Sequence, residues 1–92
     1  MRNIKLLDGT IFEVDRCGAA DGRLRIRIID PVLSMLEAVQ IFGDPEMTAS
    51  IEHFVTGSDV DRVTFEGYTS LEAMIYDGPG LLIILREEVS ND

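Results

Sequence analysis

The segment Arg23-Leu24-Arg25-Ile26-Arg27-Ile28-Ile29 decides the fold class of this 92-residue chain. Three arginines alternate with apolar residues along it. An alternation with a period of two predicts a strand that buries one face and exposes the other. Because a chain of this length forms one domain as a rule, we expect this strand to lie in the core of a single domain spanning residues 1–92.

A hairpin is predicted around this strand. Residues 10–17 form the preceding strand candidate, and Asp21-Gly22 lies in the turn between the two strands. With the turn centred near Ala20, two acidic side chains would face two arginines: Asp15 opposite Arg25, and Glu13 opposite Arg27. The arginines would then be paired within the sheet, and a binding patch is the alternative interpretation.

Other strands are predicted from short apolar or alternating stretches bounded by turn residues. These stretches are residues 4–7, 50–55, 62–68, 71–76 and 81–85. The last is apolar at every position, which predicts a strand covered on both faces. Turns with positive φ are expected at Gly9, Gly22 and Gly78, because glycine adopts that conformation without strain.

One helix is predicted between the third and fourth strands. Ser34 and Glu37 fit a capping box, in which each side chain bonds the other residue's backbone N–H. The helix would run from about Val32 or Met35 to Phe42, and Gly43 would end it in a left-handed conformation. We therefore expect an α+β fold, mostly β, in which an antiparallel meander of about seven strands forms a small barrel or sandwich.

The predicted helix is apolar over most of its circumference. Between residues 32 and 42, only Ser34, Glu37 and Gln40 are polar. One apolar face is expected to pack on the sheet: Val32, Met35, Val39 and Phe42. The other is expected to form an interface with another protein chain: Leu33, Leu36 and Ile41. A barrel that encloses the helix is the competing account, because it would bury both faces without a partner.

The net charge of −9 is unevenly placed along the chain. Residues 1–30 carry six basic and five acidic side chains, a net charge of +1, whereas residues 31–92 carry two basic and twelve acidic ones, a net charge of −10. Phosphate contacts by basic residues dominate nucleic-acid affinity, so we expect no nucleic-acid partner. An acidic face that docks a basic partner remains open as an explanation of the charge.

Residues capable of chemistry form no recognisable motif. A single cysteine, Cys17, and a single histidine, His53, exclude a Cys/His zinc site within one chain. A Cys17–His53 dyad is possible by spacing alone, since catalytic partners meet in space. We nevertheless expect no catalytic, cofactor-binding or metal-binding residues, no cofactor and no enzymatic activity.

Several short motifs are similar to those of a known group of proteins. They are Ile4-Lys5-Leu6 before Asp8-Gly9-Thr10, the segment from Cys17 to Gly22, Glu37-Ala38 before the segment from Ile41 to Thr48, and the segment from Phe65 to Thr69. With these, nearly the whole chain resembles small uncharacterised prophage-type bacterial proteins, whose genes tend to lie near phage tail and baseplate genes. The resemblance implies a structural or assembly role and transfers no catalytic residue.

The sequence thus leads to three functional hypotheses. The first and preferred one is a non-enzymatic structural or protein-interaction module, associated with a phage tail or an assembly, that acts as a homo-oligomer or on another protein. The main alternative is an acidic inhibitor or regulator that mimics nucleic acid and docks a basic partner. The third is a small enzyme that uses Cys17 or a pair of carboxylates. No membrane partner is expected, because no apolar run reaches the roughly 18 residues of a membrane helix. With no signal-peptide pattern at the N-terminus, we expect a cytoplasmic protein that can be assembled into a phage particle.

Overall fold

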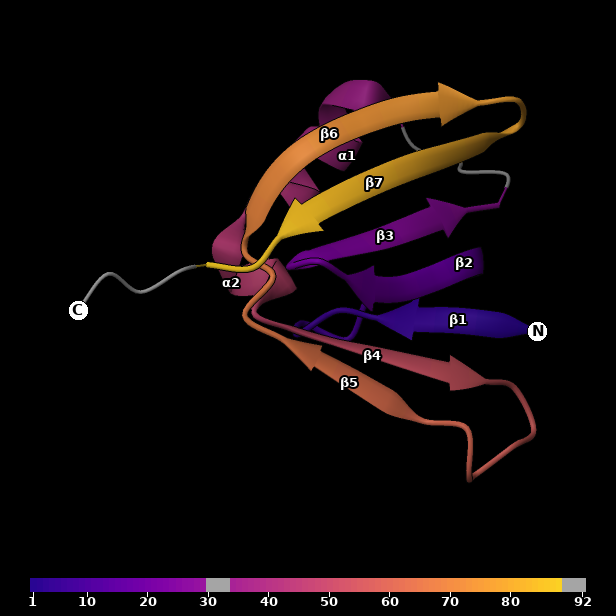
Figure 1. Ribbon diagram of the computed structural model, residues 1–92. Coiled ribbons are helices and arrows are strands. Elements are labelled where there is room, and N and C mark those ends of the chain that lie inside the picture. Colours follow the sequence, from indigo (N-terminus) through magenta and orange to yellow (C-terminus); the bar gives the residue numbers. More distant parts are fainter. Residues whose placement is uncertain (30–33, 89–92) are drawn as a thin grey trace.

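In the part of the chain that the structure describes, the strands form a seven-stranded antiparallel sheet (Figure 1). The computed structural model describes residues 1–29 and 34–88. The elements are β1 (Arg2–Lys5), β2 (Ile11–Ala20), β3 (Arg23–Ile28), α1 (Met35–Phe42), α2 (Pro45–Thr48), β4 (Ser50–Val55), β5 (Val63–Glu66), β6 (Ser70–Asp77) and β7 (Gly80–Arg86). The expected α+β class is confirmed, as is a helix between the third and fourth strands.

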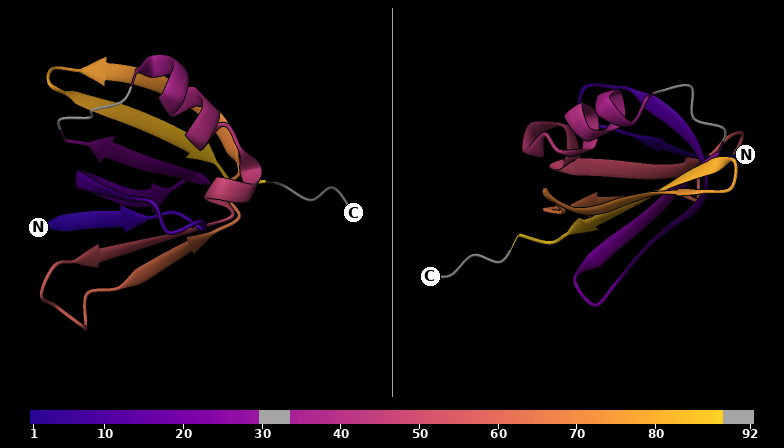
Figure 2. Two further views of the ribbon diagram at one scale, coloured as in Figure 1. Left: turned by 180° about the vertical axis from the view of Figure 1, so that it is seen from behind. Right: turned by 90° about the horizontal axis from the view of Figure 1, so that it is seen from above.

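The sheet is open and does not close into a barrel. Its strand order is β5-β4-β1-β2-β3-β7-β6, so β5 and β6 are edge strands with one neighbour each. The sheet bends strongly, and α1 and α2 lie together on one side of it (Figure 2). Because the helices cover apolar side chains there, the core is buried without closure of the sheet.

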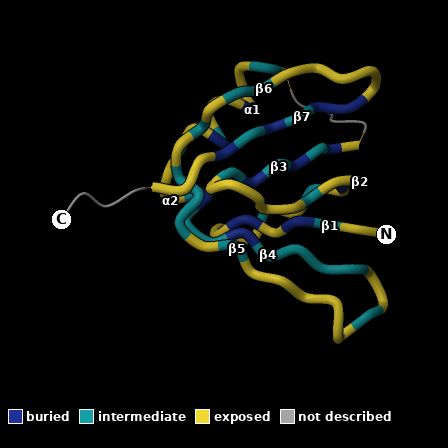
Figure 3. Tube along the Cα trace, in the orientation of Figure 1, coloured by how far each residue is buried: buried dark blue, intermediate teal, exposed yellow. Residues whose placement is uncertain are grey.

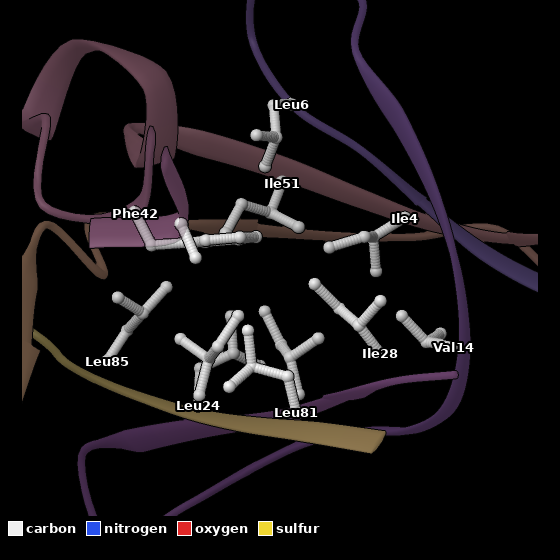
Figure 4. Packing of buried hydrophobic residues seen from close by; sticks show 12 residues of the cluster. Ile4, Leu6, Val14, Leu24, Ile28, Phe42, Ile51, Leu81 and Leu85 are labelled. Atoms are coloured by element: carbon white, nitrogen blue, oxygen red, sulfur yellow. The ribbon is translucent and has the colours of Figure 1, made fainter. Parts of the chain in front are cut away.

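The core fills the space between the two halves of the bent sheet. Phe42 of α1 lies between side chains of β1 and β4 on one side and side chains of β3 and β7 on the other (Figure 4). Its ring is 5.6 Å from that of Phe12, centroid to centroid. The tube in Figure 3 shows the buried positions concentrated in the central strands, with the edges more exposed. The side chain of Phe42 thus lies between the two halves of the core.

The alternating burial of β3 and β7 distinguishes the two faces of the sheet. On β3, Leu24, Ile26 and Ile28 are buried. On β7, Leu81, Ile83 and Leu85 are buried, whereas Leu82 and Ile84 are half-buried. The expectation of a strand fully covered on both faces is therefore wrong for the second face of β7, because both helices lie on the core side.

The β2–β3 hairpin has a different register from the predicted one. Asp21 and Gly22 both have positive φ, +55° and +74°, which is typical of a two-residue type I′ turn. The turn therefore lies beyond Ala20, which pairs with Arg23. A β-bulge at Asp15 shifts the ladder once more. As a result the predicted pairing of Glu13 and Asp15 with arginines is wrong in register, although Asp15 does form an ion pair with an arginine of β3.

The expected glycine turns and the N-terminal cap of α1 are confirmed, but the expected left-handed conformation of Gly43 is wrong, because Gly43 ends the helix at φ −83°. Gly9, Gly22 and Gly78 have φ values of +96°, +74° and +60°. At the start of α1, the hydroxyl of Ser34 accepts a hydrogen bond from the backbone N–H of Glu37, whose carboxylate accepts one from the backbone N–H of Ser34. These local features fix where the elements begin and end.

Candidate interaction surfaces

The exposed side of α1 is apolar at two positions. Leu36 is 68% exposed and Val39 is 41% exposed, and they lie three residues apart on one face of the helix. Of the three predicted interface residues, Leu36 is thus at the surface, while Ile41 packs against the core and Leu33 lies outside the described residues.

The prediction of which helix residues pack on the sheet was wrong for Val39, and it left out Ala38. The buried face is centred on Ala38, which is 0% exposed, with Met35 and Ile41 each about 60° away around the helix. Val39 is about 100° from Ala38 around the helix and is 41% exposed. The contact with the sheet is therefore rotated relative to the predicted one.

A second surface consists of arginines on the face of the sheet opposite the core. We call it the arginine face; it consists of Arg16 on β2, Arg23, Arg25 and Arg27 on β3, and Arg86 on β7. The register shows that they share this face, since Arg16 pairs with Arg27 and Arg86 pairs with Arg23. Sequence reasoning found only the β3 row, because the position of Arg16 relative to it depends on the bulge at Asp15.

Arg23 on β3 forms an ion pair with the edge strand β6, across the intervening strand β7. Its Nε lies 2.7 Å from a carboxylate oxygen of Glu72, which belongs to β6, on the far side of β7. The hydrogen bond from Arg23 lowers the pKa of Glu72 below its usual value, and the charges of Arg86 and Arg25 lower it further. Glu72 is therefore ionised at neutral pH and anchored to the centre of the sheet.

Arg27 forms a second and more extensive anchor. Its guanidinium binds the carboxylate of Asp15, lies 3.2 Å from a carboxylate oxygen of Asp77, and donates a hydrogen bond of 2.9 Å to the backbone carbonyl of Asp77. The same guanidinium packs against Gly80. Arg27 thus connects the bulge of β2 to the turn between β6 and β7.

Cys17 and His53 are not brought together. His53 is in register with Ile4 and, through it, with Phe12 on β2, five residues from Cys17. Five residues of strand correspond to about 16 Å, with two strand spacings in addition. Burial raises the pKa of the Cys17 thiol to about 11, which disfavours the nucleophilic thiolate. The two residues do not form a nucleophile–base pair in this structure.

His53 lines a shallow hollow at one end of the sheet. The hollow measures about 350 Å³ and is also lined by Arg2 and Asp61. The Nε2 atom of His53 is buried with no hydrogen-bond partner among the described residues. Burial lowers the pKa of His53 and the charge of Arg2 lowers it further, so the imidazole is neutral at pH 7. Within residues 1–29 and 34–88, no group of three or more His, Cys, Asp or Glu side chains could hold a metal ion.

Comparison with protein-family models, curated proteins and solved structures gives no match. Within the described part of the chain, neither helix has the length and apolar character required to cross a membrane. The functional interpretation therefore depends on the two surfaces described above.

Proposed function

We propose that this chain is a non-enzymatic structural or protein-interaction module that acts as an oligomer. The observation that carries the proposal is the exposure of Leu36, a large aliphatic residue that is 68% exposed on a helix whose opposite side packs on the core. Val39 extends this exposed apolar surface by one turn of the helix. Glu37 and Gln40 border it, as polar residues border the buried centre of an interface.

Burial of these two side chains would stabilise a complex. Full burial of one aliphatic side chain contributes about 1.5–3 kcal/mol. A contact between α1 helices of two copies would bury Leu36 twice in a symmetric dimer, because the same patch occurs on both subunits. The resemblance to prophage-type proteins adds the setting of the proposal, which is an assembly such as a phage tail or baseplate.

The open edges of the sheet also favour association. β5 and β6 each hydrogen-bond to one neighbour, and an unpaired strand edge is a template for pairing with another chain. Ile75 and Tyr76 of β6 are 51% and 53% exposed, and Val63 of β5 is 50% exposed. These edges offer a second contact to an oligomer that begins at α1.

The experiment compares two variants of neighbouring exposed residues on α1. Leu36→Asp removes the apolar contact, and Gln40→Asp adds the same charge one turn away. Light scattering should give a monomer mass for the Leu36→Asp protein and an oligomer mass for the Gln40→Asp protein, with both folded by circular dichroism. Equal masses for the two variants would contradict a role for Leu36 in assembly.

The placement of charge favours a second candidate function, an acidic regulator that mimics nucleic acid. The arginine face contains five arginines and the carboxylates Asp15, Glu72 and Asp77, a net charge of +2. Since the net charge of the whole chain is −9, the residues outside the arginine face carry a net charge of −11. Docking of this negative charge on a basic partner should weaken steeply as salt rises, whereas an apolar interface through Leu36 should not.

A further inference from the structure

Three arginines of the arginine face take part in none of the ion pairs formed among the described residues. Arg23 and Arg27 are held by carboxylates of β2 and β6. No carboxylate among the described residues lies within 4.0 Å of a guanidinium nitrogen of Arg16, Arg25 or Arg86. The anchoring of β6 therefore accounts for two arginines and leaves three cations without an ion pair among the described residues.

These three arginines lie on one diagonal across three adjacent strands. Arg25 on β3 is directly opposite Gly18 on β2 and Ile84 on β7. Arg16 and Arg86 are each two residues away from those partners, in opposite directions along the sheet. Each is therefore a diagonal neighbour of Arg25 at about 7–8 Å between backbones. We call this set the arginine diagonal.

The arrangement places like charges next to one another. Arg16 is directly opposite Arg27, and Arg23 is directly opposite Arg86. Like charges in directly opposed positions destabilise a sheet. Glu72 offsets part of this repulsion because it lies in the field of Arg86 and Arg25 as well as that of Arg23. Additional carboxylates from outside the chain would offset the remainder.

The surface beside the diagonal has room for another polypeptide. At Gly18, no heavy atom outside the neighbouring residues lies within 4 Å of the position a Cβ would take. On the other side of Arg25, Leu82 and Ile84 provide half-buried apolar surface. A partner chain can therefore approach the backbone of β2 and contact apolar side chains of β7.

We infer that the arginine diagonal binds an extended acidic segment of a partner protein. A guanidinium matches a carboxylate with two parallel N–H groups, which favours carboxylate recognition by arginine. Carboxylates at every second residue of an extended chain repeat at about 7 Å, close to the spacing along the diagonal. This inference rests on the proposed role as an interaction module and adds the chemistry of the partner.

Charge complementarity favours an acidic protein segment over nucleic acid. The diagonal is short, because two diagonal steps separate Arg16 from Arg86, a distance of about 15 Å between backbones. Outside the arginine face, the chain carries a net charge of −11. A nucleic-acid strand longer than the diagonal would meet this negative charge, whereas a short acidic segment would not.

The experiment measures binding of a fluorescein-labelled octapeptide that alternates glutamate with serine. Fluorescence anisotropy at low salt is recorded for the native chain, Arg25→Gln, Arg16→Gln and Arg62→Gln. Arg62 is the matched control because it loses the same charge but is paired with Glu52, away from the diagonal. We expect Arg25→Gln and Arg16→Gln each to weaken binding about tenfold and Arg62→Gln to change it less than twofold.

Three results would overturn the inference: no binding of the peptide by the native chain, equal weakening by Arg25→Gln and Arg62→Gln, or tighter binding of an oligothymidylate of the same charge. Thermal unfolding of each variant checks that it is folded, and exposed Arg16 provides a readout even if Arg25→Gln destabilises the sheet. Light scattering on the same samples reports self-association. Failure of the peptide to bind an oligomeric native chain would end this inference alone, and a monomeric native chain would end the proposed assembly alone.

Discussion

The guanidinium of Arg27 occupies the space that a side chain on Gly80 would need. A Cβ on Gly80 would lie 2.8 Å from Cζ of Arg27 and 3.0 Å from its Nε. The guanidinium is held there by Asp15 and by Asp77, and the Arg27 side chain is only 19% exposed. Arg27, which lies on the central strand β3, therefore packs against Gly80 at the turn between β6 and β7.

Gly80→Ala should destabilise the protein by about 1–3 kcal/mol, because Arg27 must move and lose contacts with its carboxylates. Gly18→Ala is the matched control, since no atom lies within 4 Å of its Cβ position. Denaturant unfolding measures both. In an Arg27→Ala background, the cost of Gly80→Ala should largely disappear. An unchanged cost in that background would show that Arg27 is not the cause.

Gly9→Val should destabilise the protein by about 1–3 kcal/mol, because Gly9 has φ +96° and a β-branched residue is strained there. Gly18→Val introduces the same side chain at a strand position without positive φ and should have little effect. Thermal unfolding of the two variants tests the difference. Similar midpoints would mean that the turn after β1 tolerates another conformation.

The ion pair between Arg23 and Glu72 should make stability depend on pH. Because the folded state lowers the pKa of Glu72, this contribution is fully present above the ordinary value of 4.5 and is lost as pH falls through the folded pKa. Unfolding of the native chain and of Glu72→Gln should therefore differ at pH 7 and converge in acid. Glu13→Gln, which removes a carboxylate with no ion pair among the described residues, is the control. A difference that stays constant down to acid pH would contradict the assignment.

Local signals in the sequence predicted the local structure well. The alternation over residues 23–29 identified β3, and the Ser34–Glu37 pair identified the start of α1, because both depend on neighbouring residues alone. The hairpin register could not be predicted in the same way. It depends on whether the chain turns at Ala20 or at Asp21-Gly22 and on a bulge at Asp15, and hydrophobic alternation specifies neither.

The candidate surfaces were only partly predictable for a similar reason. Leu36 was predicted at an interface and is exposed. Val39 was predicted to pack on the sheet but is exposed, and Ile41 was predicted at the interface but packs against the core. The burial of Ala38 and Phe42 sets this rotation of α1 on the sheet. The arginine diagonal also depends on long-range register. Arg16 and Arg86 join Arg25 only through the pairing of β3 with β2 and β7.

The mass of the native chain in solution shows whether it assembles through the exposed face of α1. The chain has a mass of 10.2 kDa, and light scattering over a range of protein concentrations measures the mass of the species that it forms. We expect a mass of at least twice this value at micromolar concentrations, with little change as salt rises, because apolar burial at Leu36 drives the contact. A mass of 10.2 kDa at all concentrations would show that the chain does not assemble through Leu36.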